Sequence, residues 1–445
     1  MASTTSKGTR AKGAFGAVLA LAAISLITPA VAQAQTTGSI FSGFPGFGAP
    51  QQPAAGGGHP EMSPQAIAAA QANFGNCIAA MWPQAQAKGV SRRTFERYTA
   101  TLEPDMKIMD FLDSQPEFSK PIGAYVTMLV SDWRVKKGRE ILARYKPIFD
   151  QVEKAYGVDR YAVAAIWGIE STYGDPKGIG NRNVLVSTAT LACIGRRQDY
   201  FREEFIATLQ ILEKDDVPYD HLKGSWAGAF GPTQFMPTSF QRFAVDFDRD
   251  GKRNVVDSIP DIIASTANNL KLDGWEFGKP WGYEVVLPQG FDYRYANRTF
   301  KQSLGQWASL GVTRPGGKGF ARATDQAYLL LPAGANGPAF LMMGNFNAIL
   351  KYNPADAYAL AIGHLADQLR GGGAFAQPWP KEERGLSKAE RLEIQGRLSQ
   401  MGYDIGNVDG ILGQKTKNAI QDFQVRRGLL PDGYPDVALL DQLRR

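Results

Sequence analysis

Histidine and cysteine are scarce in this sequence. The few histidines argue against one class of metal site, and the two cysteines allow at most one disulfide bond within the chain. Three histidines occur among 445 residues, His59, His221 and His364, widely spaced and without a motif around them. A catalytic zinc site takes three protein ligands, usually including histidine, so this spacing argues against a zinc amidase or peptidase. The two cysteines, Cys77 and Cys193, can form one disulfide bond or remain two buried free thiols, and the sequence leaves both alternatives open.

Dense runs of one charge are absent, and so are long apolar runs beyond the N-terminal segment. The formal net charge of +6 is compatible with an anionic polymer as partner, but no lysine and arginine cluster resembles a nucleic-acid-binding arm. No later segment is apolar enough to span a bilayer. A chain of 445 residues is long enough for two or three domains.

The N-terminal segment has the three parts of an export signal. Basic residues precede an apolar stretch over residues 14–32, which ends in the small residues of Ala32-Gln33-Ala34. This order predicts a signal peptide over residues 1–34 that is removed on export to the periplasm. The alternative is an uncleaved membrane anchor, and Pro29 and the cleavage-like end argue against it. No cysteine stands directly after the apolar run to carry a lipid.

Changes in composition divide the rest of the chain. Residues 35–62 are rich in Gly, Pro, Ala and Gln and predict a flexible linker. Apolar residues at helical spacing then continue to residue 370, interrupted between 283 and 346 by short β-prone runs. Residues 371–384 form a second linker before a compact unit over 385–445. The sequence predicts a mainly α fold with a small inserted β-containing subdomain. Helices are expected around 136–156, 160–171, 201–212, 355–370 and 416–427.

One acidic residue stands at the end of an apolar helical segment. Glu170 follows Trp167 by one turn, and Ala and Ile dominate the preceding turns. Asp159 is a plausible N-cap for this helix. Apolar surroundings favour the neutral form of a carboxyl group, which a general acid near neutral pH requires. The alternative is a surface glutamate near a helix C-terminus, which the helix dipole would mildly disfavour.

A second segment, Gly224–Phe240, combines small residues and aromatics with the polar Ser225 and Gln234. Sugar sites need flat apolar faces together with amide or hydroxyl groups, and this composition offers both. The alternative is a glycine-rich packing turn without a ligand.

Together the two segments resemble the lytic murein transglycosylase B family, which has a lysozyme-like core. The matching motifs are Gly-Ile-Glu-Ser-Thr-Tyr-Gly at 168–174 and Gly-Ser-Trp-Ala-Gly-Ala-Phe-Gly-Pro-Thr-Gln-Phe-Met-Pro-Thr-Ser at 224–239. The resemblance runs from about residue 73 to about residue 370, and the expected catalytic domain spans residues 63–370. It implies a peptidoglycan lytic transglycosylase with Glu170 as catalytic acid and base. Asn269 departs from it, because a relative has a site tyrosine there. The implied substrate-binding residues are Ser225, Gln234, Phe235, Arg196, Arg197, Tyr352, Asn353, Tyr358 and Tyr125.

One acid suffices for the chemistry that the resemblance implies. Glycosidases that use water or a covalent intermediate normally need two carboxylates. In a transglycosylase the substrate's own 6-hydroxyl attacks, so Glu170 first protonates the glycosidic oxygen and then accepts the proton of that hydroxyl. The β-1,4 bond between N-acetylmuramic acid and N-acetylglucosamine breaks, and a 1,6-anhydromuramoyl end forms. A lysozyme-type hydrolase and a non-catalytic wall-binding protein are the alternatives.

The segment Asp246–Lys252 matches the opening of an EF-hand loop, with acids at alternate positions before Gly251. Asp257 occupies the place of the usual final Glu. In a member of the resembled family the loop is longer, and its last ligand matches Asp261. The resemblance implies a structural Ca²⁺, with no cofactor required for catalysis; an acidic turn without metal is the alternative. The implied ligands are Asp246, Asp248, Asp250, Lys252 and Asp261.

Residues 386–443 resemble the three-helix peptidoglycan-binding domain found on many cell-wall enzymes. The resemblance implies that peptidoglycan glycan strands are the partner, and that the module concentrates the enzyme on an insoluble polymer. We expect a monomer that binds no nucleic acid and keeps no transmembrane anchor after removal of the signal. The match is carried by Asp409-Gly410, Gly413, Thr416, Phe423-Gln424 and Asp432-Gly433.

Overall fold

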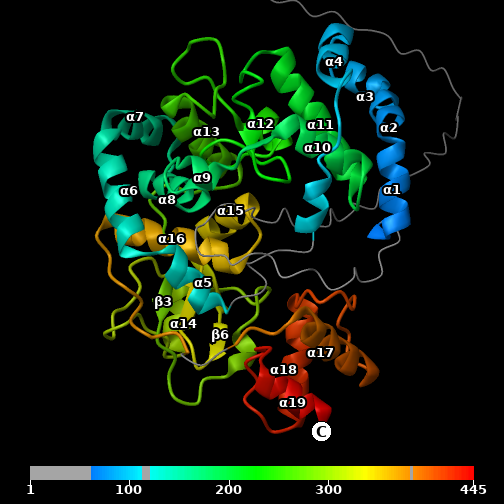
Figure 1. Cartoon of the computed structure of the whole chain (residues 1–445). Helices are drawn as coiled ribbons and strands as arrows, with labels where there is room; N and C mark the ends of the chain where they lie inside the picture. Colours follow the sequence, from blue (N-terminus) through cyan, green and yellow to red (C-terminus); the bar gives the residue numbers. More distant parts are fainter. Residues whose placement is uncertain (1–61, 113–120, 381–383) are drawn as a thin grey trace, which may run out of the picture. The chain divides into compact units, whose positions relative to one another are not determined.

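A computed structural model describes residues 62–112, 121–380 and 384–445 (Figure 1). The predicted signal peptide over 1–34 lies outside the described residues, as does all but the last residue of the predicted linker 35–62. Within the described ranges, no helix is both long and apolar enough to cross a membrane. The fold is mainly helical with small sheets, as the sequence predicts.

The N-terminal helices share a core with a helical hairpin made of α10 (Val184–Cys193) and α11 (Gln198–Glu213). A disulfide bond joins Cys77 to Cys193 with an S–S distance of 2.01 Å, which decides between the two alternatives that the sequence left open. The bond ties the N-terminal helices to the end of α10. These helices are α1 (Pro64–Ala72), α2 (Phe74–Ala80), α3 (Trp82–Ala87), α4 (Arg92–Thr99) and the 3-10 helix η2 (Met106–Phe111).

A second core surrounds α8 (Arg160–Ser171), in which every residue from Ala162 onward is buried. The Asp159 carboxylate accepts the N–H of Tyr161 at 2.8 Å and so caps the helix as predicted. Thr172, with a φ of 58°, is in the left-handed conformation and ends it. Figure 1 shows α8 beside α16. The helices packed on α8 are α6 (Asp132–Arg144), α7 (Lys146–Tyr156), α9 (Pro176–Ile179), α13 (Ile259–Leu272) and α16 (Asp356–Arg370).

The single helix expected around 136–156 is instead the two helices α6 and α7, with a break at Tyr145. Pro147 stands in the first turn of α7 and has no N–H with which to continue the hydrogen bonds of α6. The apolar period runs through both helices, which is why periodicity alone did not separate them.

The inserted subdomain is built on an antiparallel sheet in the order β3-β7-β5-β4. Alternate residues of β5 face opposite cores: Tyr328 and Leu330 join the core around α8, whereas Leu329 joins a separate core around Trp307. Burial on both faces explains the continuous apolar runs of its strands. The elements are β3 (Gly282–Val285), η4 (Tyr293–Tyr295), β4 (Gln302–Ser303), α14 (Leu304–Ser309), β5 (Gln326–Leu330), β6 (Pro332–Ala335) and β7 (Ala339–Met342).

The described part of the predicted second linker packs on the catalytic body. Phe375 stacks on His364 with ring centroids 3.8 Å apart. The Glu284 carboxylate accepts the N–H groups of Ala376 and Gln377, each at 2.8 Å. Beyond it the C-terminal unit has three helices around its own apolar core, which includes Phe423. These helices are α17 (Lys388–Gln400), α18 (Gln414–Arg426) and α19 (Val437–Arg444).

Candidate active site

Glu170, the penultimate residue of α8, lies in an almost closed environment. Glu170 is only 5% exposed, and its Oε1 accepts a hydrogen bond from the Tyr358 hydroxyl at 2.6 Å. Tyr358 lies in the first turn of α16, which packs along α8. Burial raises the pKa of Tyr358 well above its ordinary value, and the charge of Glu170 adds to this, so the phenol stays protonated and donates.

A second tyrosine, Tyr352, is partly buried and joins this group from α15 (Gly344–Tyr352). The Tyr352 hydroxyl donates to the Thr233 carbonyl, and its ring meets Phe235 edge-on with centroids 6.2 Å apart. Burial raises the pKa of Tyr352 well above its ordinary value, and Glu170 contributes, which places this phenol within electrostatic reach of the acid. The structure therefore brings together Glu170, Tyr358, Tyr352 and Phe235 from three separate regions of the chain.

Two more predicted residues border the tyrosines. Asn353 follows Tyr352, is buried, and its Oδ1 accepts the N–H of Ala355 at 3.2 Å. Tyr125, on α5 (Ile122–Leu129), is 1% exposed and lies close enough to contribute to the raised pKa of Tyr358.

The loop over 224–236 is tied directly to the end of α8. Ser171, next to Glu170, donates from Oγ to the Pro232 carbonyl at 2.6 Å and accepts the N–H of Gly174 at 2.9 Å. Gly224 must be glycine, because a Cβ there would lie 2.0 Å from the Ala229 carbonyl oxygen. The supporting elements are β1 (Arg182–Asn183), β2 (Lys223–Gly224) and α12 (Pro237–Phe243). The glycine-rich composition thus has a packing role as well as a place beside the acid.

Ser225 and Gln234, the two predicted polar residues of the loop, differ in whether they keep a hydrogen-bond acceptor without a partner among the described residues. Ser225 is buried and its Oγ accepts the N–H of Ala229 at 3.1 Å, so it braces its own turn. Gln234 has a φ of 52°, and its Nε2 donates to the carbonyls of Ile179 and Gly231 at 3.2 and 2.9 Å. Its Oε1 is buried without a hydrogen-bond partner among the described residues, and can accept from a ligand hydroxyl.

The arginine pair lies on a different element. Arg196 and Arg197 form the turn between α10 and α11, just after Cys193. The Arg196 guanidinium donates to the Leu112 carbonyl, and Arg197 lies over the Tyr200 ring, 4.5 Å from its centroid. On α13, the departing residue Asn269 is buried, and its Oδ1 lacks a hydrogen-bond partner within the described ranges.

Sequence reasoning missed three residues that hold this site together. Ser171 joins α8 to the loop, although its place beside Glu170 was a usable signal. Thr233 offers its carbonyl to Tyr352, and its Oγ1 is buried without a partner in the described part of the chain. Arg134 is buried beneath α8 and donates from Nε to the Gly168 carbonyl at 3.0 Å. A lone arginine on α6 gives no such signal in sequence.

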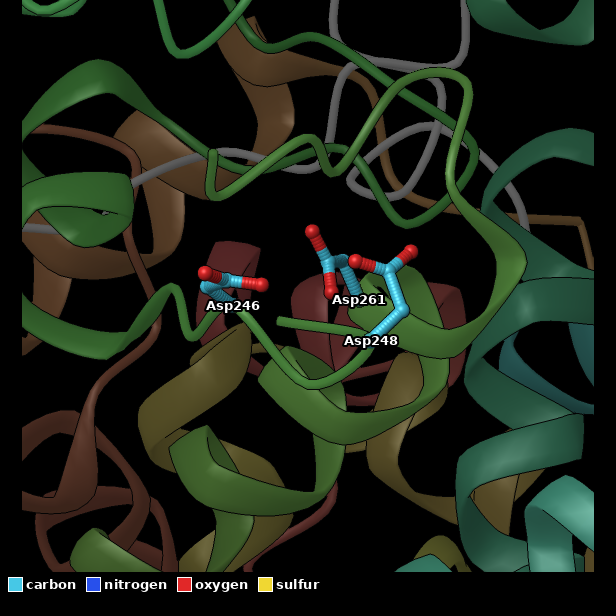
Figure 2. Close-up of side chains that lie close together, drawn as sticks. All are labelled: Asp246, Asp248 and Asp261. Atoms are coloured by element: carbon cyan, nitrogen blue, oxygen red, sulfur yellow. The ribbon is translucent and has the colours of Figure 1, made fainter. Parts of the chain in front are cut away.

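The acidic loop forms a separate cluster at the start of α13. Ligand atoms of Asp246, Asp248 and Asp261 all lie within 4.8 Å of one another, and Figure 2 shows the three carboxylates converging. The two carboxylate oxygens of Asp261 accept the N–H groups of Phe247 and Asn254 at 2.7 and 2.8 Å. Burial is the main reason that the pKa of Asp261 is raised to about 6.

The other expected ligands of this loop are not among these three converging carboxylates. The Asp250 carboxylate accepts the N–H of Lys252 at 2.8 Å, and the Lys252 ammonium pairs with Asp215 at 2.5 Å. Asp257, at the usual last position of an EF-hand loop, pairs instead with His221 at 3.0 Å. Within the described residues, Asp246 Oδ1 is buried and has no hydrogen-bond partner.

Two regions of this chain match known protein families. Residues 73–367 match the family described as transglycosylase SLT domain, and residues 387–443 match a family of peptidoglycan binding domains. The chain is 33% identical over 261 residues to membrane-bound lytic murein transglycosylase B of Escherichia coli K12, which covers 56% of this chain and 68% of that protein.

Solved structures agree with these matches. SltB3 from Pseudomonas aeruginosa, in complex with NAG-anhNAM-pentapeptide, superposes with a TM-score of 0.80 at 47% identity, covering 84% of this chain and 99% of that chain. Escherichia coli lytic transglycosylase Slt35, in complex with calcium, superposes with a TM-score of 0.56 at 27% identity, covering 67% of this chain and 92% of that one.

Proposed function

The chain belongs to the transglycosylase SLT family and is a peptidoglycan-cleaving lytic transglycosylase with a C-terminal peptidoglycan-binding domain, and on this premise we propose its reaction and its catalytic residue. It cleaves the β-1,4 bond between N-acetylmuramic acid and N-acetylglucosamine and leaves 1,6-anhydromuramoyl ends. The observation that carries the proposal is the buried Glu170 carboxylate, hydrogen-bonded to Tyr358 beside a wall of aromatic side chains. SltB3, which is similar, was solved with an anhydro-sugar ligand.

Glu170 acts first as acid and then as base. Its proton passes to the glycosidic oxygen, the bond from that oxygen to C1 of the muramic acid breaks, and the 2-acetamido group stabilises the positive charge at C1. The Glu170 carboxylate then takes the proton of the 6-hydroxyl, whose oxygen bonds to C1. The attack is intramolecular, so the reacting atoms are already held together. The Tyr358 hydroxyl keeps the Glu170 carboxylate in one place between the two transfers.

The remaining residues bind the sugar chain. Gln234 Oε1 is an acceptor for a sugar hydroxyl. The partly buried Tyr352, packed edge-on against the buried Phe235, offers an apolar face to a pyranose ring. The proposal also includes the other residues that the family resemblance implies. These are Ser225, Arg196, Arg197, Asn353, Tyr358 and Tyr125.

Mass spectrometry of the fragments released from purified peptidoglycan tests the reaction. Anhydro ends are lighter than hydrolysed ends by one water molecule, so the two chemistries separate by mass. We expect anhydromuramoyl fragments from the wild-type chain and none above background from Glu170→Gln. Fragments with reducing ends would identify a lysozyme-type hydrolase instead.

We also propose that Asp246, Asp248 and Asp261, with Asp250 and the Lys252 carbonyl, hold a structural Ca²⁺. The donor set fits, because Ca²⁺ takes carboxylate and carbonyl oxygens and the buried Asp246 Oδ1 has no other described partner. Slt35, a similar protein, was solved in complex with calcium. The ion would offset the mutual repulsion of the carboxylates; it takes no part in the Glu170 chemistry.

Residues 1–34 are proposed to direct export to the periplasm, with 63–370 as catalytic domain and 385–445 as wall-binding domain. Comparison of the mature N-terminus of the exported protein with Gln35 tests the first of these assignments.

A further inference from the structure

A cavity of about 300 Å³ lies between the inserted subdomain and the C-terminal module. One wall consists of Arg298 and the chain over 329–332. The other consists of Arg391 and Lys417 together with the turns at Gly410 and Gly433. None of these residues belongs to the Glu170 group, so the cavity is a second, separate site candidate.

The two walls are held together by direct contacts. The Ala335 N–H donates to Asp432 Oδ2 at 3.0 Å, and Gln421 Nε2 donates to the Tyr293 carbonyl at 3.2 Å. Gly334 has a φ of 66°, and a Cβ there would lie 2.9 Å from Tyr434 Cβ, so the module approaches the subdomain backbone closely. SltB3 superposes on 84% of this chain, a larger share than residues 73–367 make up.

Cationic side chains dominate the polar lining. Arg298 is paired with Asp356, and Arg391 donates to the carbonyls of Gly410 and Leu386. Asp432, the acid of the lining, is already occupied, because its carboxylate accepts from Ala335, Gln424 and Tyr434.

Lys417 differs from the two arginines. Within the described residues its ammonium has neither a hydrogen bond nor an ion pair, although it is half-buried on α18. Burial lowers the pKa of Lys417, and the positive charge of Arg298 adds to this, whereas Asp356 opposes it. An anionic group in the cavity would supply the missing partner and favour the charged amine.

Size and shape narrow the class of ligand. A volume of about 300 Å³ is at the small end of ligand sites, which suits a short peptide rather than a glycan strand. The N–H groups of Gly410 and Gly433 in the glycine turns already donate to Gln395 and Gln424, so a peptide in the cavity would be recognised through its charge. A nucleic acid would need a continuous basic surface rather than one enclosed cation cluster.

We propose that this cavity binds the carboxylate end of the peptide stem of peptidoglycan, with Lys417 as the principal contact. The proposal rests on the proposed function only in that the chain acts on peptidoglycan. Binding at this point would hold the stem at a site separate from the glycan cleaved at Glu170.

The test uses the full chain carrying Glu170→Gln, with calorimetry to measure binding of the free peptidoglycan pentapeptide and of its C-terminal amide. We expect the pentapeptide to bind about tenfold more weakly when Lys417 is changed to Gln, because one charge-assisted contact is lost. The amide should lose a similar factor in the unchanged chain. Lys415→Gln is the matched control: Lys415 is on the same helix, exposed, and paired with Asp404 at 2.9 Å.

Equal binding by the Lys417→Gln and Lys415→Gln chains would overturn the proposal. Equal binding of the pentapeptide and its amide would overturn it as well. This comparison uses the chain with Lys417 unchanged, so it does not depend on whether a Lys417 variant folds. Cleavage of peptidoglycan by the wild-type chain is assayed separately. Its absence would refute the proposed function, whereas lost discrimination between the peptide and the amide would refute the cavity assignment alone.

Discussion

Glu170 on α8 and Glu204 on α11 are both buried carboxylates, 5% and 0% exposed. Glu204 accepts the N–H of Thr238 at 2.9 Å and its hydroxyl at 2.7 Å, so it satisfies the first turn of α12. Tyr200, on the same helix, also hydrogen-bonds Glu204. Glu170 meets a phenol from a distant helix, with Tyr352 close enough to feel its charge. Burial therefore does not distinguish the two glutamates; the partners of each carboxylate do.

The largest effect is expected at Glu170. Glu170→Gln keeps the size of the side chain but can neither donate nor accept the transferred proton, so lytic activity should fall at least about a hundredfold. Release of soluble fragments from purified peptidoglycan measures the loss, and an unchanged melting temperature shows that the fold persists.

Asp273→Asn is the control for this loss. Asp273 is buried at the end of α13, and its charge also reaches Tyr352. Retained activity in Asp273→Asn is expected for a single-acid mechanism. A loss as large as that of Glu170→Gln would reveal a second catalytic carboxylate.

The carboxylates of the acidic loop have a third kind of proposed partner, a bound cation. Calcium at a hundredfold excess over its dissociation constant should stabilise the folded chain by about 2.7 kcal/mol, because it binds only that state. Thermal melts in chelator, millimolar calcium and magnesium measure this, and magnesium should do less because it demands a tighter octahedral shell. Asp246→Asn should abolish the calcium response. Identical melting temperatures in chelator and calcium would leave the loop a plain acidic turn.

Glu204→Gln should lower stability rather than chemistry. The amide NH₂ of Gln cannot accept a hydrogen bond, so one of the two Thr238 donors loses its acceptor, at a cost of about 1–3 kcal/mol in the free energy of unfolding. Urea denaturation measures this cost, while activity per folded molecule should stay near wild type. A hundredfold loss of activity in the folded variant would erase the distinction between the two glutamates.

The cost of Glu204→Gln should depend on pH. Burial raises the pKa of Glu204, against the lowering effect of the Thr238 hydrogen bonds. The folded chain then keeps a proton that the unfolded chain has released, so the stability from Glu204 is full below the ordinary pKa of about 4.3 and is lost as the pH rises through the folded-state pKa. Glu204→Gln should therefore cost more near pH 4 than near pH 7, and the opposite trend would contradict this account.

The smallest effect is expected at Tyr358. Tyr358→Phe removes the hydroxyl that donates to Glu170 but keeps the ring, so kcat should fall about tenfold, the worth of one charge-assisted hydrogen bond. Tyr145→Phe is the control, because Tyr145 packs on Trp167 from another side at 6.0 Å and should change little. An unchanged kcat in Tyr358→Phe would remove this hydroxyl from the mechanism.

The sequence determined what depends on neighbours along the chain. The apolar period over 160–171 and the Asp159 cap predicted α8 with its observed ends, because helix formation and capping use contacts within one or two turns. The motif around Glu170 predicts the catalytic acid in the same local way. The break at Tyr145 was missed because the apolar period continues across it.

Which distant residues meet depends on how the whole chain folds. Tyr358 donates to Glu170 across 188 positions, and Cys77 bonds Cys193 across 116. The cavity at Lys417 likewise arises where two regions pack. Helical periodicity predicts which face of an element is buried, but the burial of any apolar face is favourable against many partners. The choice of partner depends on how all the helices pack at once, and this is why periodicity in a single sequence did not reveal it.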